Sequence, residues 1–171
     1  MNDAVIVAAR RTPTGKREGM LSGIHPADLS ALVIEDIVST TGIDPNLIDD
    51  VIWGCVTQAG EQTGDIARTA ALSAGLPESV TGVTVDRQCG SSQQALHFAA
   101  AGVASGQYDI AIAGGVESMS RNPMFSSSMG KSPYGTKFKD RYQGDDPNQG
   151  IGAEMIAEKW GFSRTELDEF A

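Results

Sequence analysis

Apolar and β-branched residues fall into four short runs, separated by longer segments with a helical period. The runs are predicted to be strands, because a short stretch without polar alternation is typical of a strand covered on both faces. They lie at residues 4–9, 51–53, 83–85 and 110–113. Helices are predicted at residues 26–41, 64–74 and 91–105. Strands that alternate with helices indicate an α/β fold with a parallel sheet.

The first predicted helix begins at about Pro26 or Asp28 and ends at Thr41. Gly42 can take the left-handed conformation that ends a helix. The apolar face of this helix is predicted to contain Leu29, Leu32, Val33 and Ile37.

Residues 83–115 form the clearest unit of the chain, a strand, a helix and a second strand. Such a βαβ unit is expected to have parallel strands and a right-handed crossover. Its helix, residues 91–105, is apolar on nearly every side. A helix of this kind is enclosed by protein, so we expect either a layer between two sheets or an interface that covers its outer face.

Residues 150–171 are predicted to form two helices, the first of them over residues 151–160. Ser163 and Glu166 have the spacing of a capping box, which predicts the start of the second. Because that helix has hardly begun at residue 171, we expect the sequence to be a piece of a longer protein.

Composition and charge restrict the function. Of the 171 residues, 40% are hydrophobic and 20% charged, as in ordinary globular proteins. A formal net charge of −9 argues against binding to nucleic acid or to an anionic membrane. No apolar run has the length of a transmembrane helix, and the N-terminus lacks a signal-peptide pattern. Two cysteines make neither a disulfide framework nor a metal site, so we predict a cytoplasmic protein without a metal.

One stretch of the chain is basic, although the chain as a whole is acidic. Between Arg121 and Arg141 there are five basic residues and a single acid. The stretch is rich in Ser, Gly and Pro, so it is predicted to be a loop. It is either a solvated connection or a surface that attracts an anionic ligand or a partner.

Cys89 is the strongest candidate for chemistry. It lies between the predicted strand 83–85 and the predicted helix 91–105. There the helix dipole and free backbone N–H groups favour the thiolate, which is the nucleophilic form. The small residues 90–92 leave room for a reacting group. Most unpaired cysteines are structural, and Cys55, in a strand-like context, is predicted to be one of them.

Four blocks of sequence, in the same order, resemble the N-terminal part of thiolases, the acetyl-CoA acyltransferases. The blocks are RRTPTGKREGML (10–21), VTQAGEQTGDIARTAALSAGLP (56–77), VDRQCGSSQQAL (85–96) and GGVESMSR (114–121). The resemblance implies a layered αβαβα fold, in which two similar halves each contribute a sheet and a buried helix. Residues 1–120 would be the N-terminal half-domain with the nucleophile elbow. Residues 121–171 would be the truncated start of a loop domain that binds CoA.

The resemblance also implies an activity. In thiolases the cysteine that matches Cys89 takes an acyl group from acyl-CoA as a thioester. Acyl groups then pass between CoA thioesters, either in thiolytic cleavage of a 3-oxoacyl-CoA or in a Claisen condensation. CoA thioesters would be substrates, no cofactor would be bound covalently, and the protein would be a homodimer or homotetramer.

The rest of the family's machinery matches nothing in residues 1–171. A histidine that activates the nucleophile and a second cysteine belong to the second half, so this piece alone is expected to be inactive. Many short-chain thiolases have His-Met-Gly where this chain has Asn148-Gln149-Gly150. Strict specificity for acetoacetyl-CoA is therefore not expected, and Gln149 is a candidate for lining the acyl pocket.

Other polar residues are given mainly structural roles. Glu117 is predicted to be a buried acid that holds active-site loops, with catalysis as the alternative. Arg68 is predicted to pair with an acid near a dimer interface. His25 is predicted to be solvated, and His97 to be a core or interface histidine. Methionines that either pack or line an acyl pocket are Met119, Met124 and Met129.

Two alternative functions remain open. One is a ketosynthase of the thiolase superfamily, which also has a cysteine at a helix start. The other is a short non-catalytic thiolase-like module that dimerises or regulates. Acyl chain length and the direction of the reaction are not predicted.

Overall fold

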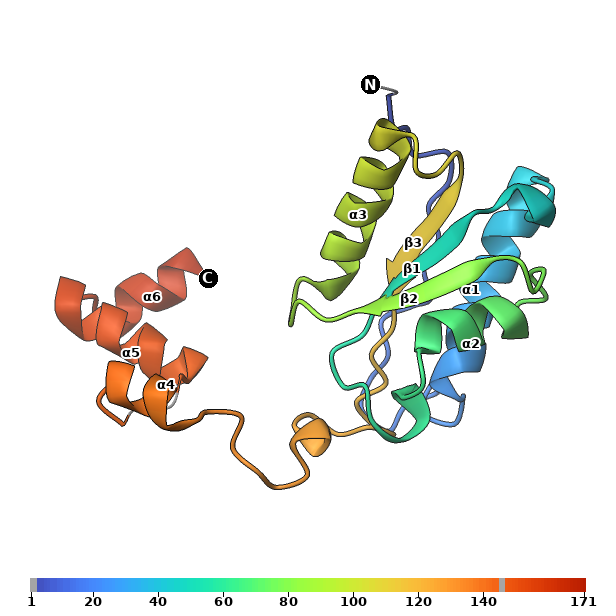
Figure 1. Ribbon diagram of the computed structural model, residues 1–171. Coiled ribbons are helices and arrows are strands. Elements are labelled where there is room, and N and C mark those ends of the chain that lie inside the picture. The colour runs from blue at the N-terminus through green and yellow to red at the C-terminus, as the bar shows by residue number, and fades with distance from the viewer. Residues whose placement is uncertain (1–2, 145–146) are drawn as a thin grey trace. The chain divides into compact units, whose positions relative to one another are not determined.

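The computed structural model describes residues 3–144 and 147–171. They divide into two compact units, Met1–Met129 and Gly130–Ala171. The strands belong to the first unit, and the second is helical (Figure 1).

A parallel sheet of three strands forms the centre of the first unit. The strands are β1 (Asp50–Gly54), β2 (Thr81–Val85) and β3 (Ala111–Gly115), in the order β2-β1-β3. Both outer strands pair with β1 in parallel. Every residue of β1 is buried, as expected for the middle strand of a sheet covered on both faces. The predicted α/β fold with a parallel sheet is confirmed.

Helices cover both faces of the sheet. Two helices, α1 (Pro26–Thr41) and α2 (Ile66–Ser73), contact each other on one face, and α3 (Ser91–Ser105) lies on the opposite face (Figure 1). Alternate residues of a strand point to opposite faces. Accordingly, Val51 and Trp53 join the apolar cluster beneath α1 and α2, whereas Ile52 packs with residues of α3. The remaining short helices of this unit are η1 (Pro45–Leu47), η2 (Gly60–Gln62) and η3 (Ser126–Ser128).

The limits of α1 agree with the prediction, but its buried face does not. Gly42 ends the helix with a φ of 65°, and its N–H donates to Val38 O at 3.0 Å. The buried residues are Pro26, Ala27, Ser30, Ala31 and Ile34. Ile34 and mainly small side chains thus face the core, whereas Leu29, Val33 and Ile37 are half-buried. The predicted apolar face is therefore not the fully buried face. Leu32 is exposed, and His25 is not simply solvated, because its Nδ1 accepts from Ala27 N at 3.2 Å and caps the helix.

Residues 4–9 have no regular secondary structure, and in the part of the chain that the structure describes they pair with no strand. Val5, Ile6 and Val7 are between 72% and 86% exposed. The predicted buried strand is therefore wrong for the described chain. A strand needs a neighbour to hydrogen-bond with and a layer to cover it, and residues 3–144 and 147–171 supply neither here.

Helix α3 has the predicted limits and ends at Gly106, which has a φ of 78°. Its buried residues, Ser91, Ala95, Ala99 and Gly102, form one stripe that faces the sheet. Leu96 and Phe98 are more than 40% exposed. Within the described chain, α3 is therefore covered on the face toward the sheet alone. Its outer face has no covering layer there, so the predicted enclosure of the helix is only partly confirmed.

The second unit contains α4 (Thr136–Arg141), α5 (Gln149–Trp160) and α6 (Arg164–Phe170). The capping box predicted for Ser163 and Glu166 is present at the start of α6. Helix α4 corrects the prediction of a continuous loop up to residue 141. Its sequence lacks a helical apolar period, but the ring of Phe138 stacks on that of Tyr134 with centroids 4.5 Å apart. None of the described helices is long and apolar enough to cross a membrane.

The carboxylate of Asp49 stabilises the turn before β3 by hydrogen bonds. It should therefore make the stability of the fold depend on pH. Its Oδ2 accepts from Ile110 N at 3.0 Å and from Asp109 N at 2.7 Å. These donors hold the pKa of Asp49 below its ordinary value of 3.8. A carboxyl group whose pKa is lowered in the native state stabilises the fold at pH values above its ordinary pKa. This stabilisation is lost as the pH falls through the lowered pKa of the native state.

We therefore expect the difference in melting temperature between the wild type and Asp49→Asn to shrink below a pH of about 4. Thermal unfolding followed by circular dichroism at a series of pH values measures this difference. A difference that stays constant through the acid range would contradict the proposed role of the carboxylate.

Candidate active site

Cys89 is exposed and lies in the turn that joins β2 to α3. The residue before it, Gln88, has a φ of 48°. This left-handed conformation is uncommon for a residue with a side chain. The backbone of the turn is therefore strained at Gln88. The next residue is Cys89, the nucleophile predicted from the sequence.

Two side chains stabilise this turn. Asp86 Oδ1 accepts from Gln88 N at 2.8 Å. Ser91 Oγ accepts from Arg87 N at 2.9 Å and donates to Gln88 O at 2.6 Å. Strained conformations persist where the surroundings fix them in this way, so Cys89 has a defined position in front of α3.

The start of α3 provides a positive environment. Its N-cap is Gly90, and no side chain among the described residues caps the first turn. The first backbone N–H groups of a helix lack intrahelical acceptors and form the positive end of the helix dipole. These groups can stabilise negative charge that develops close to Cys89.

Cys55 is buried, whereas Cys89 is exposed. Cys55 is 1% exposed and belongs to the main apolar cluster. Burial, followed by the charges of Glu117 and Asp86, raises the pKa of its thiol to about 12. A buried thiol with such a pKa is not a nucleophile at neutral pH, so the predicted structural role of Cys55 is confirmed.

Glu117 and Gln62 connect the loops that follow β1 and β3. Glu117 Oε2 accepts from Val56 N at 2.9 Å, and its Oε1 accepts from Gln62 Nε2 at 2.8 Å. Gln62 is fully buried, and its Oε1 accepts from Ser118 N at 2.7 Å. The predicted loop-holding hydrogen bonds of Glu117 are confirmed, but the residue is exposed and not buried. Sequence analysis missed Gln62, which no local pattern distinguishes from a surface glutamine.

A groove of about 880 Å³ lies elsewhere in the first unit. Met119 and Met124 line it, and Cys89 does not. Met129 is 80% exposed. Lining of an acyl pocket by these methionines stays a prediction.

Two arginines are used for structural contacts. Arg121 pairs with Glu61, with Nη2 at 2.6 Å from Oε1, and lowers the pKa of that carboxyl group. Arg68 donates to the carbonyl oxygens of Val80 and Glu78. Within the described chain its hydrogen bonds go to backbone oxygens and not to an acid, and pairing with an acid near a dimer interface stays a prediction. His97 is exposed on α3, so it is not a core histidine there.

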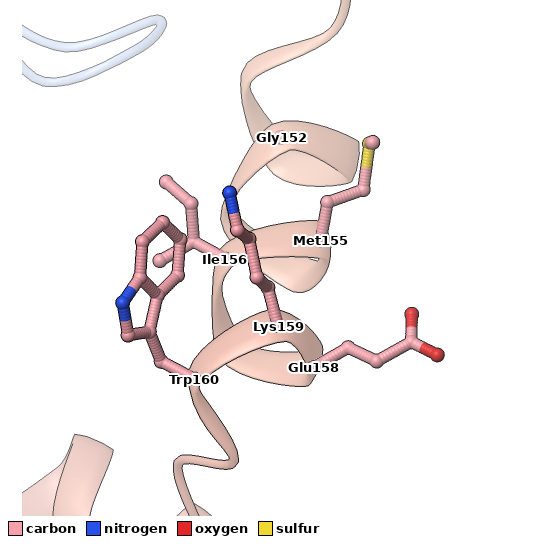
Figure 2. A pocket seen from close by; sticks show the side chains of 6 residues that line it. All are labelled: Gly152, Met155, Ile156, Glu158, Lys159 and Trp160. Carbon is pink, nitrogen blue, oxygen red and sulfur yellow. The ribbon is translucent and has the colours of Figure 1, made fainter.

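Gln149 is the first residue of α5 and is exposed. The same helix carries a surface hollow lined by Gly152, Met155, Ile156, Glu158, Lys159 and Trp160 (Figure 2). The ammonium group of Lys159 lies 4.6 Å from the centre of the Trp160 ring. Gln149 does not line this hollow. Because Gln149 and Cys89 belong to different units, a shared site for them stays a prediction.

Within residues 3–144 and 147–171, no three His, Cys, Asp or Glu side chains gather as metal ligands would.

The first unit is thus an α/β protein unit with a parallel sheet and an exposed cysteine in a strand-to-helix turn. Comparison with known proteins identifies the family. The family model described as thiolase, N-terminal domain, matches residues 4–171. The chain belongs to the thiolase family.

Named relatives and a solved structure agree with this result. Steroid 3-ketoacyl-CoA thiolase FadA6 of Mycobacterium tuberculosis is 46% identical over 179 residues, covering 100% of this chain and 44% of that protein. Beta-ketoadipyl-CoA thiolase of Escherichia coli is 40% identical over 187 residues, covering 100% of this chain and 46% of its own. A crystal structure of the acetyl-CoA acetyltransferase of Bacillus anthracis superposes with a TM-score of 0.78 at 34% identity, covering 99% of this chain and 45% of that one. The chain thus spans less than half the length of these relatives.

Proposed function

We propose that Cys89 is the acyl-carrying nucleophile of an enzyme that transfers acyl groups between CoA thioesters. The observation that carries the proposal is the exposed Cys89 on a fixed turn before α3. The thiolases among its relatives have the same family fold, and the names of several specify 3-ketoacyl-CoA.

In the cleavage direction, the thiolate of Cys89 attacks the 3-oxo carbon of a 3-oxoacyl-CoA. A bond forms between sulfur and this carbon, and the bond between C2 and C3 breaks. Acetyl-CoA leaves as a carbanion that takes up a proton. The sulfur of free CoA then attacks the enzyme thioester, which releases the shortened acyl-CoA and restores the thiolate.

A thiol suits this chemistry because transfer between thioesters is nearly isoenergetic and sulfur is a good leaving group in both directions. The N–H of Cys89 would donate to the thioester oxygen as part of an oxyanion hole. We infer that the groups which activate the thiol and move the α-proton lie outside residues 1–171.

The same proposal covers the domains and the substrate. Residues 1–120 would be half of the layered αβαβα core, and residues 121–171 the start of a loop domain that contacts CoA, with Gln149 near the acyl group. An acyl chain larger than acetoacetyl is supported by Gln149 and by relatives named for steroid and β-ketoadipyl substrates. A homodimer or homotetramer in the cytoplasm stays a prediction.

Alkylation of the full-length protein tests the proposal. Iodoacetamide is expected to label Cys89 at least about 100-fold faster than Cys55, because one thiol is exposed and the other is buried with a raised pKa. An excess of acyl-CoA should protect Cys89 and leave an acyl group on its peptide. Peptide mapping by mass spectrometry measures both.

Labelling in urea is the control, since both thiols should then react at similar rates. If Cys55 reacted first in the native protein, the assignment would be wrong. Saturation with acyl-CoA that gave neither protection nor an acyl adduct would instead favour a non-catalytic thiolase-like module.

A further inference from the structure

The glycines at the ends of the two neighbouring strands lie directly beneath the start of α3. Gly54 ends β1 and Gly115 ends β3, and the two are partners in the sheet. We propose that Gly54 and Gly115 are positioning residues for Cys89. This inference rests on the proposed function, since it concerns the placement of the nucleophile named there.

The contact beneath α3 has no space for a side chain. A Cβ on Gly54 would lie 2.5 Å from Ser91 C and 2.8 Å from Ser92 Cα. A Cβ on Gly115 would lie 2.6 Å from Gly54 O and would overlap Ser92 Oγ. Backbone atoms meet at Gly54, so a methyl group there can be accommodated only if the helix start and the sheet move apart.

The displacement would reach Cys89. Ser91 and Ser92 are the first two residues of α3, and Ser91 is buried. Ser91 N donates to Gln88 O at 3.0 Å, and Ser91 Oγ accepts from Arg87 N at 2.9 Å. The turn that carries Cys89 is thus bonded to the residue that Gly54 touches. A shift of about 1 Å at a reacting group can lower a rate by about 100-fold.

Gly82 provides a matched control. A Cβ on Gly82, in β2, would lie 2.7 Å from Arg68 N and 3.0 Å from Ala67 C. These are again backbone atoms in the first turn of a helix, but the helix is α2, on the opposite face of the sheet from α3. Gly82→Ala should therefore strain the fold as Gly54→Ala does, without moving the turn of Cys89.

The experiment compares Gly54→Ala with Gly82→Ala in the full-length protein, at a temperature where circular dichroism shows both to be folded. Both variants should have lower melting temperatures than the wild type. For acyl transfer between CoA thioesters, Gly54→Ala should lower kcat by about 100-fold with KM changed less than about threefold. Gly82→Ala should retain kcat within about threefold, and the alkylation rate of Cys89 should change only in Gly54→Ala.

A second pair of variants serves if Gly54→Ala does not fold. Gly115→Ala should also lower kcat, and adding Ser92→Gly should recover part of the loss, because it removes the nearest obstructing atom while the close contact with Gly54 O remains. Equal kcat values for Gly54→Ala and Gly82→Ala, or a wild-type kcat for Gly115→Ala, would overturn the positioning role. Full activity of Cys89→Ala is a different result, which would reject the proposed nucleophile itself.

Discussion

Replacing Cys89 by alanine is expected to lower the rate of acyl transfer in the full-length protein by at least about 10⁴-fold. The alanine has no sulfur to form the thioester, and no other described thiol can replace it, because Cys55 is buried with a raised pKa. The fold should be nearly unaffected, since exposed substitutions usually change stability by less than about 0.5 kcal/mol. Cleavage of a 3-oxoacyl-CoA by CoA, followed by product analysis, measures the rate.

Cys55→Ala is the matched control for this experiment. It removes the other thiol from the core of the first unit, so it should lower the melting temperature and keep most of the activity. If Cys89→Ala transferred acyl groups at the wild-type rate while Cys55→Ala did not, the nucleophile would have been assigned to the wrong residue.

Gln62→Leu is expected to lower the free energy of unfolding by about 3 kcal/mol. Leucine has a similar size but cannot hydrogen-bond. Ser118 N–H, Thr57 O and Glu117 Oε1 would each lose their bond to Gln62, which is fully buried. Unfolding in urea, followed by fluorescence and circular dichroism, measures the change.

Gln58→Leu is the control for Gln62→Leu. Gln58 lies in the same loop, is exposed, and donates one bond, to Cys55 O at 3.1 Å. Its loss should lower the free energy of unfolding by less than about 1 kcal/mol. Equal losses for the two variants would show that the buried hydrogen bonds of Gln62 contribute little.

Elements with a local signal could be predicted from the sequence. Helix α3 has its predicted limits because residues 98–105 are all small or apolar and Gly106 can take the conformation that ends a helix. The same holds for α6, where Ser163 and Glu166 bond reciprocally. The position of Cys89 between a strand and a helix is likewise visible in the order of residues alone, and its role as nucleophile stays a prediction.

Features that depend on distant residues could not be predicted. The buried face of α1 is decided by how closely α2 approaches, so Ala27 and Ala31 are buried and the larger Leu32 is exposed. The hydrogen bonds of Gln62 join it to Ser118, 56 positions away. Gly54 lies against the start of α3, and the residues next to Gly54 in the sequence give no sign of this contact.

The two faces of the sheet carry unequal shares of the packing. Among the described residues, thirteen buried ones form the apolar cluster on the side of α1 and α2, whereas three, Ile52, Ala95 and Ala99, form the one under α3. The fold of the first unit is therefore anchored on the face away from Cys89. Core substitutions beneath α3 should therefore disturb fewer buried side chains than core substitutions beneath α1 and α2.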